Sequence, residues 1–97
     1  MRRITTKIIE FYHNYLVSEE KSEATMDKYL RDVREFADWL GDGEFDKTDV
    51  LAYKTELTER YAPASVNTIL SSLNSFFAFN EWYELKVKTL KIQRQIF

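Results

Sequence analysis

The feature that most constrains the fold is an apolar pattern that occurs twice, forty residues apart. In the first copy, apolar side chains recur at intervals of three and four residues at Met26, Tyr29, Leu30, Val33, Phe36, Ala37 and Leu40. The second copy repeats this spacing at Val66, Ile69, Leu70, Leu73, Phe76 and Phe77, with the polar Asn80 at the last position. Such spacing places the side chains on one face of an α-helix. Each copy therefore predicts an amphipathic helix that must pack its apolar face against another element.

Signals for helix ends surround both copies. Ser22 is a suitable N-cap for a helix over residues 23–40, and Gly41 stands where a left-handed terminating residue is expected. Pro63 fits the first turn of the helix that carries the second copy, because a missing backbone N–H costs nothing there.

Two further helices are predicted by weaker patterns. The segment 6–18 has few charges, which predicts a largely buried helix, and its apolar face consists of Ile8, Phe11, Tyr12, Tyr15 and Leu16. Thr48 can cap a third helix over 49–60. The inner side of that helix is expected to hold Val50, Leu51, Lys54, Leu57 and Tyr61, with the Lys54 stem passing the edge of the core.

Composition supports an all-α chain and excludes several other classes. Two Gly and one Pro in 97 residues argue against a turn-rich β fold, and the length is that of one domain. The absence of Cys excludes disulfides and thiolate metal sites. The longest apolar run, residues 76–79, is far shorter than a membrane span, so we expect a cytoplasmic protein with no membrane partner.

The net charge of −2 hides an uneven distribution. Residues 1–7 carry +3 and residues 85–97 carry +4, so residues 8–84 carry −9. Basic terminal segments often lie along nucleic-acid phosphates, and they are also common as solvated tails. Because the whole chain is acidic, unlike most autonomous nucleic-acid-binding proteins, charge alone leaves both interpretations open.

The helix that carries the second copy is the fourth in chain order, and its outward face contains no charged residue. Projection at 100° per residue places Thr68, Ser71, Ser75 and Ala78 at its centre, Ser65 and Ser72 on one flank, and Asn67 and Asn74 on the other. Short polar side chains allow close approach to DNA bases and phosphates. They also permit packing against a protein, or plain solvent exposure. The pattern alone leaves all three open.

The outward face of the second helix places cations before anions, against the helix macrodipole. This order, which includes Lys28, Arg31 and Arg34, is consistent with a partner that attracts cations. The same charges also form i,i+4 pairs of a solvated ladder: Asp27–Arg31, Lys28–Asp32, Arg31–Glu35 and Arg34–Asp38. Both interpretations remain open from the sequence.

No constellation for catalysis or cofactor binding is present. His13 is the single histidine, and no acidic metal loop, glycine-rich phosphate loop or nucleophile motif occurs. We therefore expect no metal, no small-molecule cofactor and no chemistry carried by these residues.

Three segments, in this order and spacing, resemble the N-terminal core-binding domain of tyrosine recombinases, the phage-integrase family. The segments are SEATMDKYLRDVREFADWL, FDKTDVLAYKTEL and ASVNTILSSLNSFFAF, within a resemblance that covers roughly residues 6–80. The recurring elements are a Thr and a Tyr before a FADWL end, a Thr-Asp helix start, and Ser-x-Asn with Leu-Ser-x-Leu-x-x-Phe-Phe. The ending LKVKTLKIQRQIF also resembles the interdomain linker in integrases of mobile elements.

The resemblance implies a four-helix, SAM-like orthogonal bundle with a basic N-terminal arm and an extended C-terminal linker. In that family the domain forms half of a clamp around double-stranded DNA and uses its second and fourth helices in the groove. The DNA-binding positions that it implies here, joined by the cations of the second helix, are Thr25, Lys28, Arg31, Arg34, Ser65, Asn67, Thr68, Ser71 and Ser75. The linker residues expected near phosphates are Lys86, Lys88 and Lys91.

The sequence also departs from the family. Relatives commonly have Arg or Lys in place of Thr68 and Asn74, and the Asn-Pro pair that often follows the fourth helix is absent. The family's catalytic Arg, His, Arg and Tyr belong to a C-terminal domain that this sequence lacks. We therefore expect a core-binding domain at 1–84, a basic linker at 85–97, and a longer parent recombinase that oligomerises on DNA. The alternative is a helical protein-interaction module that uses the small-residue face of the fourth helix.

Overall fold

The computed structural model describes residues 2–92. The elements follow the chain as α1 (Thr6–Ser18), α2 (Glu23–Leu40), α3 (Lys47–Arg60), α4 (Pro63–Phe79) and a short 3₁₀ helix, η1 (Tyr83–Leu85). The predicted all-α, four-helix fold is confirmed. The end of the predicted linker, residues 93–97, lies outside the described residues.

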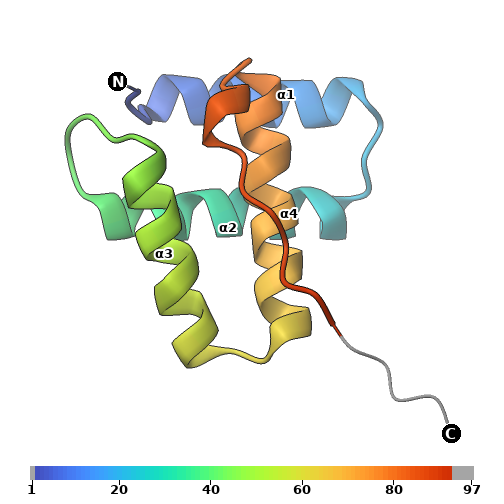
Figure 1. The fold of residues 1–97 in the computed structure, drawn as a ribbon. Coiled ribbons are helices and arrows are strands. Elements are labelled where there is room, and N and C mark those ends of the chain that lie inside the picture. Colours follow the sequence, from blue (N-terminus) through green and yellow to red (C-terminus); the bar gives the residue numbers. More distant parts are fainter. Residues whose placement is uncertain (1, 93–97) are drawn as a thin grey trace, which may run out of the picture.

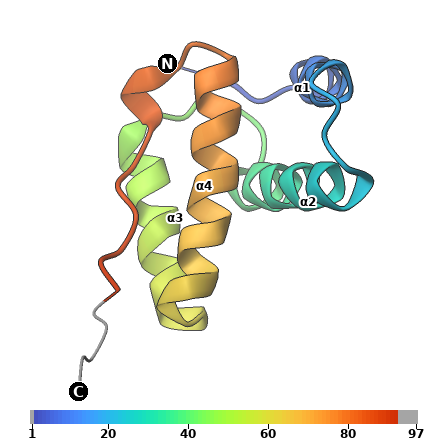
Figure 2. The ribbon, with the colours of Figure 1, turned by 90° about the vertical axis from the view of Figure 1, so that its right-hand side faces the viewer.

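The four helices form two layers that cross almost at right angles. Figure 1 shows α1 and α2 running across the view behind α3 and α4, which run along it. Figure 2, turned by 90°, shows α1 end-on and α2 foreshortened, both on the same side of α4. The apolar faces of both sequence patterns meet between the layers, where Val33 and Phe36 of α2 and Leu73 and Phe76 of α4 are fully buried. The orthogonal bundle therefore follows from two amphipathic helices that cover each other.

The predicted ends of α2 and α4 are confirmed, and the start of α3 is not. Ser22 caps α2 and Pro63 occupies the first turn of α4. The N-cap of α3 is Asp46, whose carboxylate accepts from the Thr48 N–H at 2.9 Å, whereas the sequence assigns this cap to Thr48. Asp49 Oδ2 accepts from the Asp46 N–H at 3.0 Å and completes a capping box.

The inner faces of α3 and α1 also differ from the prediction. In α3, Tyr53 is buried with its ring centroid 4.9 Å from that of Phe36, while Leu51 is 45% exposed and Tyr61 41% exposed. The aromatic contact with Phe36 thus sets the rotation of α3. The prediction that α1 is largely buried is wrong, because this helix lies at the edge of the bundle and leaves Phe11 53% exposed.

The basic N-terminal arm is attached to the domain. Arg2 forms an isolated antiparallel bridge with Phe45, with N–O distances of 3.0 and 2.7 Å. Its guanidinium pairs with Glu84 at 2.8 Å and lies 5.7 Å from the Trp82 ring centroid. The Arg2 guanidinium lowers the pKa of Glu84, chiefly through their hydrogen bond. The charge of Arg2 is therefore already paired within the domain.

Candidate nucleic-acid interface

Helices α2 and α4 cross at matching positions of the two sequence patterns. Ser72 stands forty residues after Asp32, and its hydroxyl donates to Asp32 Oδ2 at 2.7 Å. The Lys28 ammonium donates to the same oxygen at 2.6 Å. Asp32 is 2% exposed and Ser72 is fully buried. A charged hydrogen-bond network therefore joins the two helices, which is the condition under which a carboxylate can be buried.

This network changes two interpretations of the sequence. The prediction that Ser72 lies on the outward flank of α4 is wrong, because its hydroxyl faces Asp32 across the helix interface. Within residues 2–92, Lys28–Asp32 is the one member of the predicted charge ladder that closes into an ion pair, and its acid is buried rather than solvated. Arg31 Nε lies 3.9 Å from the other Asp32 oxygen, with the Arg31 side chain 62% exposed.

A groove between α2 and α4 brings four of the predicted DNA-binding residues together. Lys28 and Arg31 line it from α2, and Ser65 and Thr68 line it from α4. The groove has a volume of about 320 Å³, and its remaining lining residues are Asp32, Glu35, Tyr61 and Ile69. Two cations are thus placed beside two hydroxyl groups that come from a different helix.

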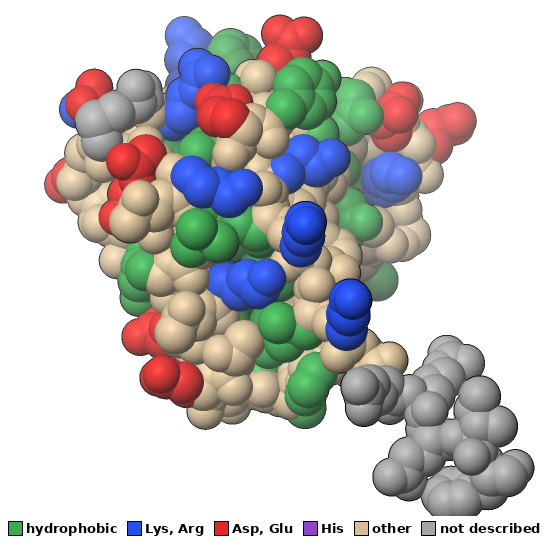
Figure 3. All heavy atoms as spheres, in the orientation of Figure 1, with side chains coloured by type: hydrophobic (Ala, Val, Ile, Leu, Met, Phe, Trp, Pro, Cys, Tyr) green, Lys and Arg blue, Asp and Glu red, His purple; other side chains and the backbone are tan. Residues whose placement is uncertain are grey.

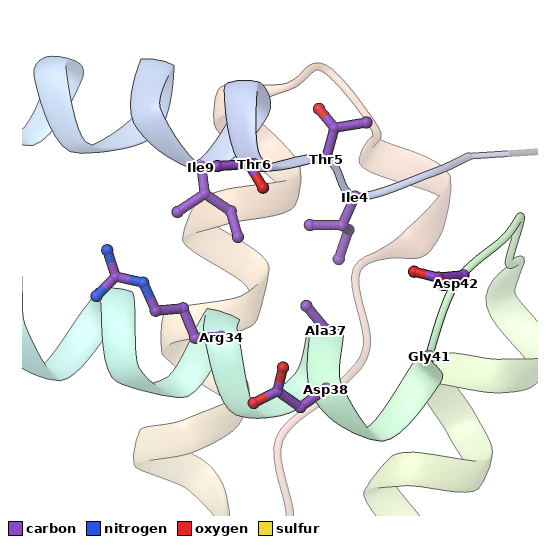
Figure 4. A pocket seen from close by; sticks show the side chains of 9 residues that line it. All are labelled: Ile4, Thr5, Thr6, Ile9, Arg34, Ala37, Asp38, Gly41 and Asp42. Carbon is purple, nitrogen blue, oxygen red and sulfur yellow. The ribbon is translucent and has the colours of Figure 1, made fainter.

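Two other predicted residues of α2 lie away from this groove. Figure 4 shows the Arg34 side chain extending toward α1, in a hollow that Ile9 and Asp38 also line. Thr25 lies in the first turn of α2, where its hydroxyl accepts from the Ser22 hydroxyl at 2.9 Å. A DNA-binding role for either residue stays a prediction.

The exposed part of α4 is narrower than the sequence projection suggests. Ser65, Thr68 and Ser71 are exposed, and we call these three residues the neutral strip. Ser75 is half-buried, and its hydroxyl is 2.9 Å from the Tyr12 hydroxyl. Burial raises the pKa of Tyr12 to about 12, against the opposing effect of the Ser75 hydrogen bond. Ser75 is therefore tied to the core through a neutral phenol.

The two asparagines of α4 hold the C-terminal segment, residues 86–92, which we call the strap. Asn74 Nδ2 donates to Val87 O at 2.8 Å, and Val87 N donates to Asn74 Oδ1 at 2.9 Å. Asn67 Nδ2 donates to Leu90 O at 2.9 Å, and Leu90 N donates to Asn67 Oδ1 at 2.7 Å. Both ends of each amide are occupied by the backbone of one strap residue. Sequence reasoning missed this contact, since it predicted only an extended segment there.

The strap carries a row of cations on its outer side. Lys86, Lys88 and Lys91 are exposed, and we call them the lysine row. Two lysines of α3 reach the same segment: Lys54 Nζ donates to Lys88 O at 2.6 Å, and Lys47 Nζ donates to Lys86 O. The predicted passage of the Lys54 stem past the core edge is consistent with this contact. Figure 3 shows lysine and arginine side chains gathered on the face that carries α3 and the strap.

The neutral strip lies between two groups of cations. In Figure 2, α2 lies on one side of α4 and the strap on the other. Lys28 and Arg31 therefore border the strip on one side, and the lysine row borders it on the other. Such an arrangement can admit an uncharged polar surface at its centre and attract negative charge at its edges through the lysine row and the exposed Arg31, while the charge of Lys28 is paired with Asp32.

Other kinds of site have no support in the part of the chain that is described. Among residues 2–92, no group of three or more histidine or acidic side chains could hold a metal ion. None of the helices in that range is long and apolar enough to cross a bilayer.

In a comparison with protein families, residues 9–84 match a model described as phage integrase, N-terminal SAM-like domain. The match includes α2, α3 and α4 completely, α1 from residue 9 onward, and η1 up to Glu84. No curated protein and no solved structure gives a significant match. Because the family model spans most of the sequence and its helical fold is the one observed, this chain belongs to the phage integrase N-terminal SAM-like domain family.

Proposed function

We propose that this domain binds double-stranded DNA and positions it for strand exchange by a catalytic domain of a longer recombinase or integrase. The neutral strip of α4 enters the major groove, and cations on both sides approach the flanking phosphates. The observation that carries this proposal is the groove that joins Lys28 and Arg31 to Ser65 and Thr68. Membership in a family of integrase N-terminal domains supports the same conclusion.

The dimensions and chemistry of DNA fit this surface. The major groove is about 12 Å wide, admits one α-helix and is bordered by phosphates on both edges. Short side chains such as Ser71 and Thr68 let the α4 backbone come close to base edges, where hydroxyls can donate or accept. Cations placed to either side then fix the register of the helix through phosphate contacts.

The balance of charge predicts weak binding that depends strongly on salt. The whole chain has a net charge of −2, so attraction to DNA must come from local groups of cations rather than from the overall field. Each phosphate that a lysine or arginine neutralises contributes about −0.9 to the slope of log K against log salt. Contacts from Arg31 and two residues of the lysine row would give a slope of about −3.

A matched pair of charge substitutions tests the proposal. Thr68→Glu adds a negative charge to the neutral strip, and Asn14→Glu adds the same charge to an exposed position of α1. Binding of a labelled short duplex is measured by fluorescence anisotropy at several salt concentrations. We expect Thr68→Glu to weaken binding by about tenfold or more and Asn14→Glu by less than about twofold, because only the first places like charges in contact.

Two results would contradict the proposal. Equal weakening by both substitutions would show that binding is a response to net charge and not to this surface. Wild-type binding that Thr68→Glu leaves unchanged would exclude the strip from the DNA interface. Sedimentation of the same variants without DNA then decides whether Thr68→Glu disrupts protein association, as expected for a protein-interaction module.

A further inference from the structure

The strap is recognised through its backbone, at intervals that match the helix beneath it. Asn74 and Asn67 are seven residues apart on α4, a rise of about 10.5 Å at 1.5 Å per residue. Val87 and Leu90 are three residues apart, a rise of about 9.3 Å in a polyproline II conformation. Lys86, at the start of the strap, has φ −63° and ψ 139°, close to that conformation. Two turns of α4 therefore fit one turn of the strap, and the two segments run antiparallel.

The side chains of the strap divide between core and solvent. Val87 is 6% exposed and Leu90 packs against the core, while the lysine row faces outward. A chain with three residues per turn places Val87 and Leu90 on the same side. The asparagine contacts and the buried aliphatic side chains therefore fix the same rotation of the strap, and that rotation determines where the lysines stand.

We propose that Asn67 and Asn74 are positioning residues that clamp the strap and hold the lysine row beside the neutral strip as a preformed phosphate-binding edge. This inference rests on the proposed function and adds a role for two residues that do not themselves contact DNA. On a free tail, each lysine would lose backbone and side-chain entropy when it met a phosphate. The clamp removes the backbone part of that cost before DNA arrives.

The clamp also reassigns Asn67. Recognition of adenine by asparagine uses the amide oxygen and nitrogen together. In Asn67 both atoms are bonded to Leu90, so this side chain cannot read a base in that bidentate way while the strap is in place. Bidentate recognition of a base by Asn67, at a position where the family resemblance implies DNA contact, would require release of the strap and of its lysines.

The first test uses the free protein. Amide hydrogen exchange is followed by NMR in wild type, in the double variant Asn67→Ala/Asn74→Ala, and in Asn14→Ala as a control for the loss of an exposed asparagine. In wild type we expect the Val87 and Leu90 amides to exchange more slowly than the amides between them. The double variant should accelerate both by about tenfold or more, with helix content by circular dichroism unchanged.

The second variant acts on the strap itself. Leu90→Pro removes the N–H that donates to Asn67, yet proline suits a polyproline II backbone, and all four helices remain untouched. We expect faster exchange at Val87 in this variant also, because the two contacts hold one short segment. Unchanged exchange in both the double variant and Leu90→Pro would overturn the clamp.

The DNA measurement separates this inference from the proposed function. The double variant should bind a short duplex more weakly, with a salt slope shallower by about 0.9 for each phosphate that the lysine row no longer neutralises, while Asn14→Ala binds as wild type does. If the salt slope of the Asn67→Ala/Asn74→Ala variant equals that of wild type, while Lys28→Ala/Arg31→Ala binds DNA more weakly, the positioning role of the two asparagines is overturned and the proposed function is retained. If wild type does not bind duplex at low salt, both the proposed function and the positioning role fail, and the exchange data still decide the clamp.

Discussion

Removing the Ser72 hydroxyl should destabilise the domain far more than removing an exposed hydroxyl from the same helix. In Ser72→Ala, the buried Asp32 carboxylate loses a 2.7 Å hydrogen bond and keeps the one from the Lys28 ammonium at 2.6 Å. A hydrogen bond to a charged group is worth about 1.5–3 kcal/mol, so the free energy of unfolding should fall by that amount. Ser71→Ala, at an exposed position, should change it by less than about 0.5 kcal/mol.

The partners of Ser72 in this network should also contribute to stability. In Asp32→Ala the Ser72 hydroxyl can still donate to Thr68 O, which is 3.2 Å away, so the expected loss is about 1–2 kcal/mol. Lys28→Ala should cost about 1–3 kcal/mol, because it leaves the buried Asp32 carboxylate without its close ammonium, although the 34% exposure of Lys28 lets water replace part of that contact. Urea unfolding followed by far-ultraviolet circular dichroism measures each difference.

A double-mutant cycle isolates the contact between the two helices. Ser72→Ala and Asp32→Ala should be coupled by about 1 kcal/mol or more, since each removes one partner of the same hydrogen bond. Strictly additive effects, or a Ser72→Ala variant as stable as wild type, would refute the claim that a charged network joins α2 and α4.

Three further predictions concern stability. Asp46→Ala should lower the free energy of unfolding, measured in urea, by about 1 kcal/mol and Thr48→Ala by much less, because Asp46 is the N-cap of α3. The reverse order would show that Thr48 is the N-cap. Burial raises the pKa of Tyr12 from 10.0 to about 12, so the unfolded chain loses this proton at lower pH than the folded domain does. The free energy of unfolding should therefore fall as pH rises from about 10 to about 12, and Tyr12→Phe should reduce this alkaline loss. Phe36→Leu should cost about 1–2 kcal/mol, because Phe36 is fully buried among other aromatic rings, whereas Phe11→Leu should have little effect; equal losses would contradict the described core.

The sequence predicts the two longest helices well because their apolar positions leave little ambiguity. Every inward residue predicted for α2 and α4 is buried or half-buried. The pattern of α3 is less decisive, since both Asp46 and Thr48 are capable N-caps and few apolar residues define its inner side. The rotation of α3 depends on the contact between Tyr53 and Phe36, which come from different helices and share no local signal.

Prediction of the site fails where a side chain has a partner distant in sequence. Helical projection identifies Thr68 and Ser71 as outward-facing, and they are exposed. Helical projection cannot show that Ser72 contacts Asp32. The two residues are forty positions apart, which is the offset between the two copies of the apolar pattern, and this coincidence was the available signal for the contact. The contact between Asn67 and the strap depends on where an aperiodic segment returns to the helix, and no spacing in the sequence encodes that path.

The proposed function requires that the surface formed by α2, α4 and the strap binds duplex DNA. Its most direct test is an amide NMR titration of the isotopically labelled domain with a short duplex, at low salt and again after salt is added. We expect shifts concentrated at residues 25–34, 64–71 and 86–91, all of which decrease when salt is raised. Shifts confined to the exposed face of α1, or no shifts at millimolar duplex, would contradict the claim.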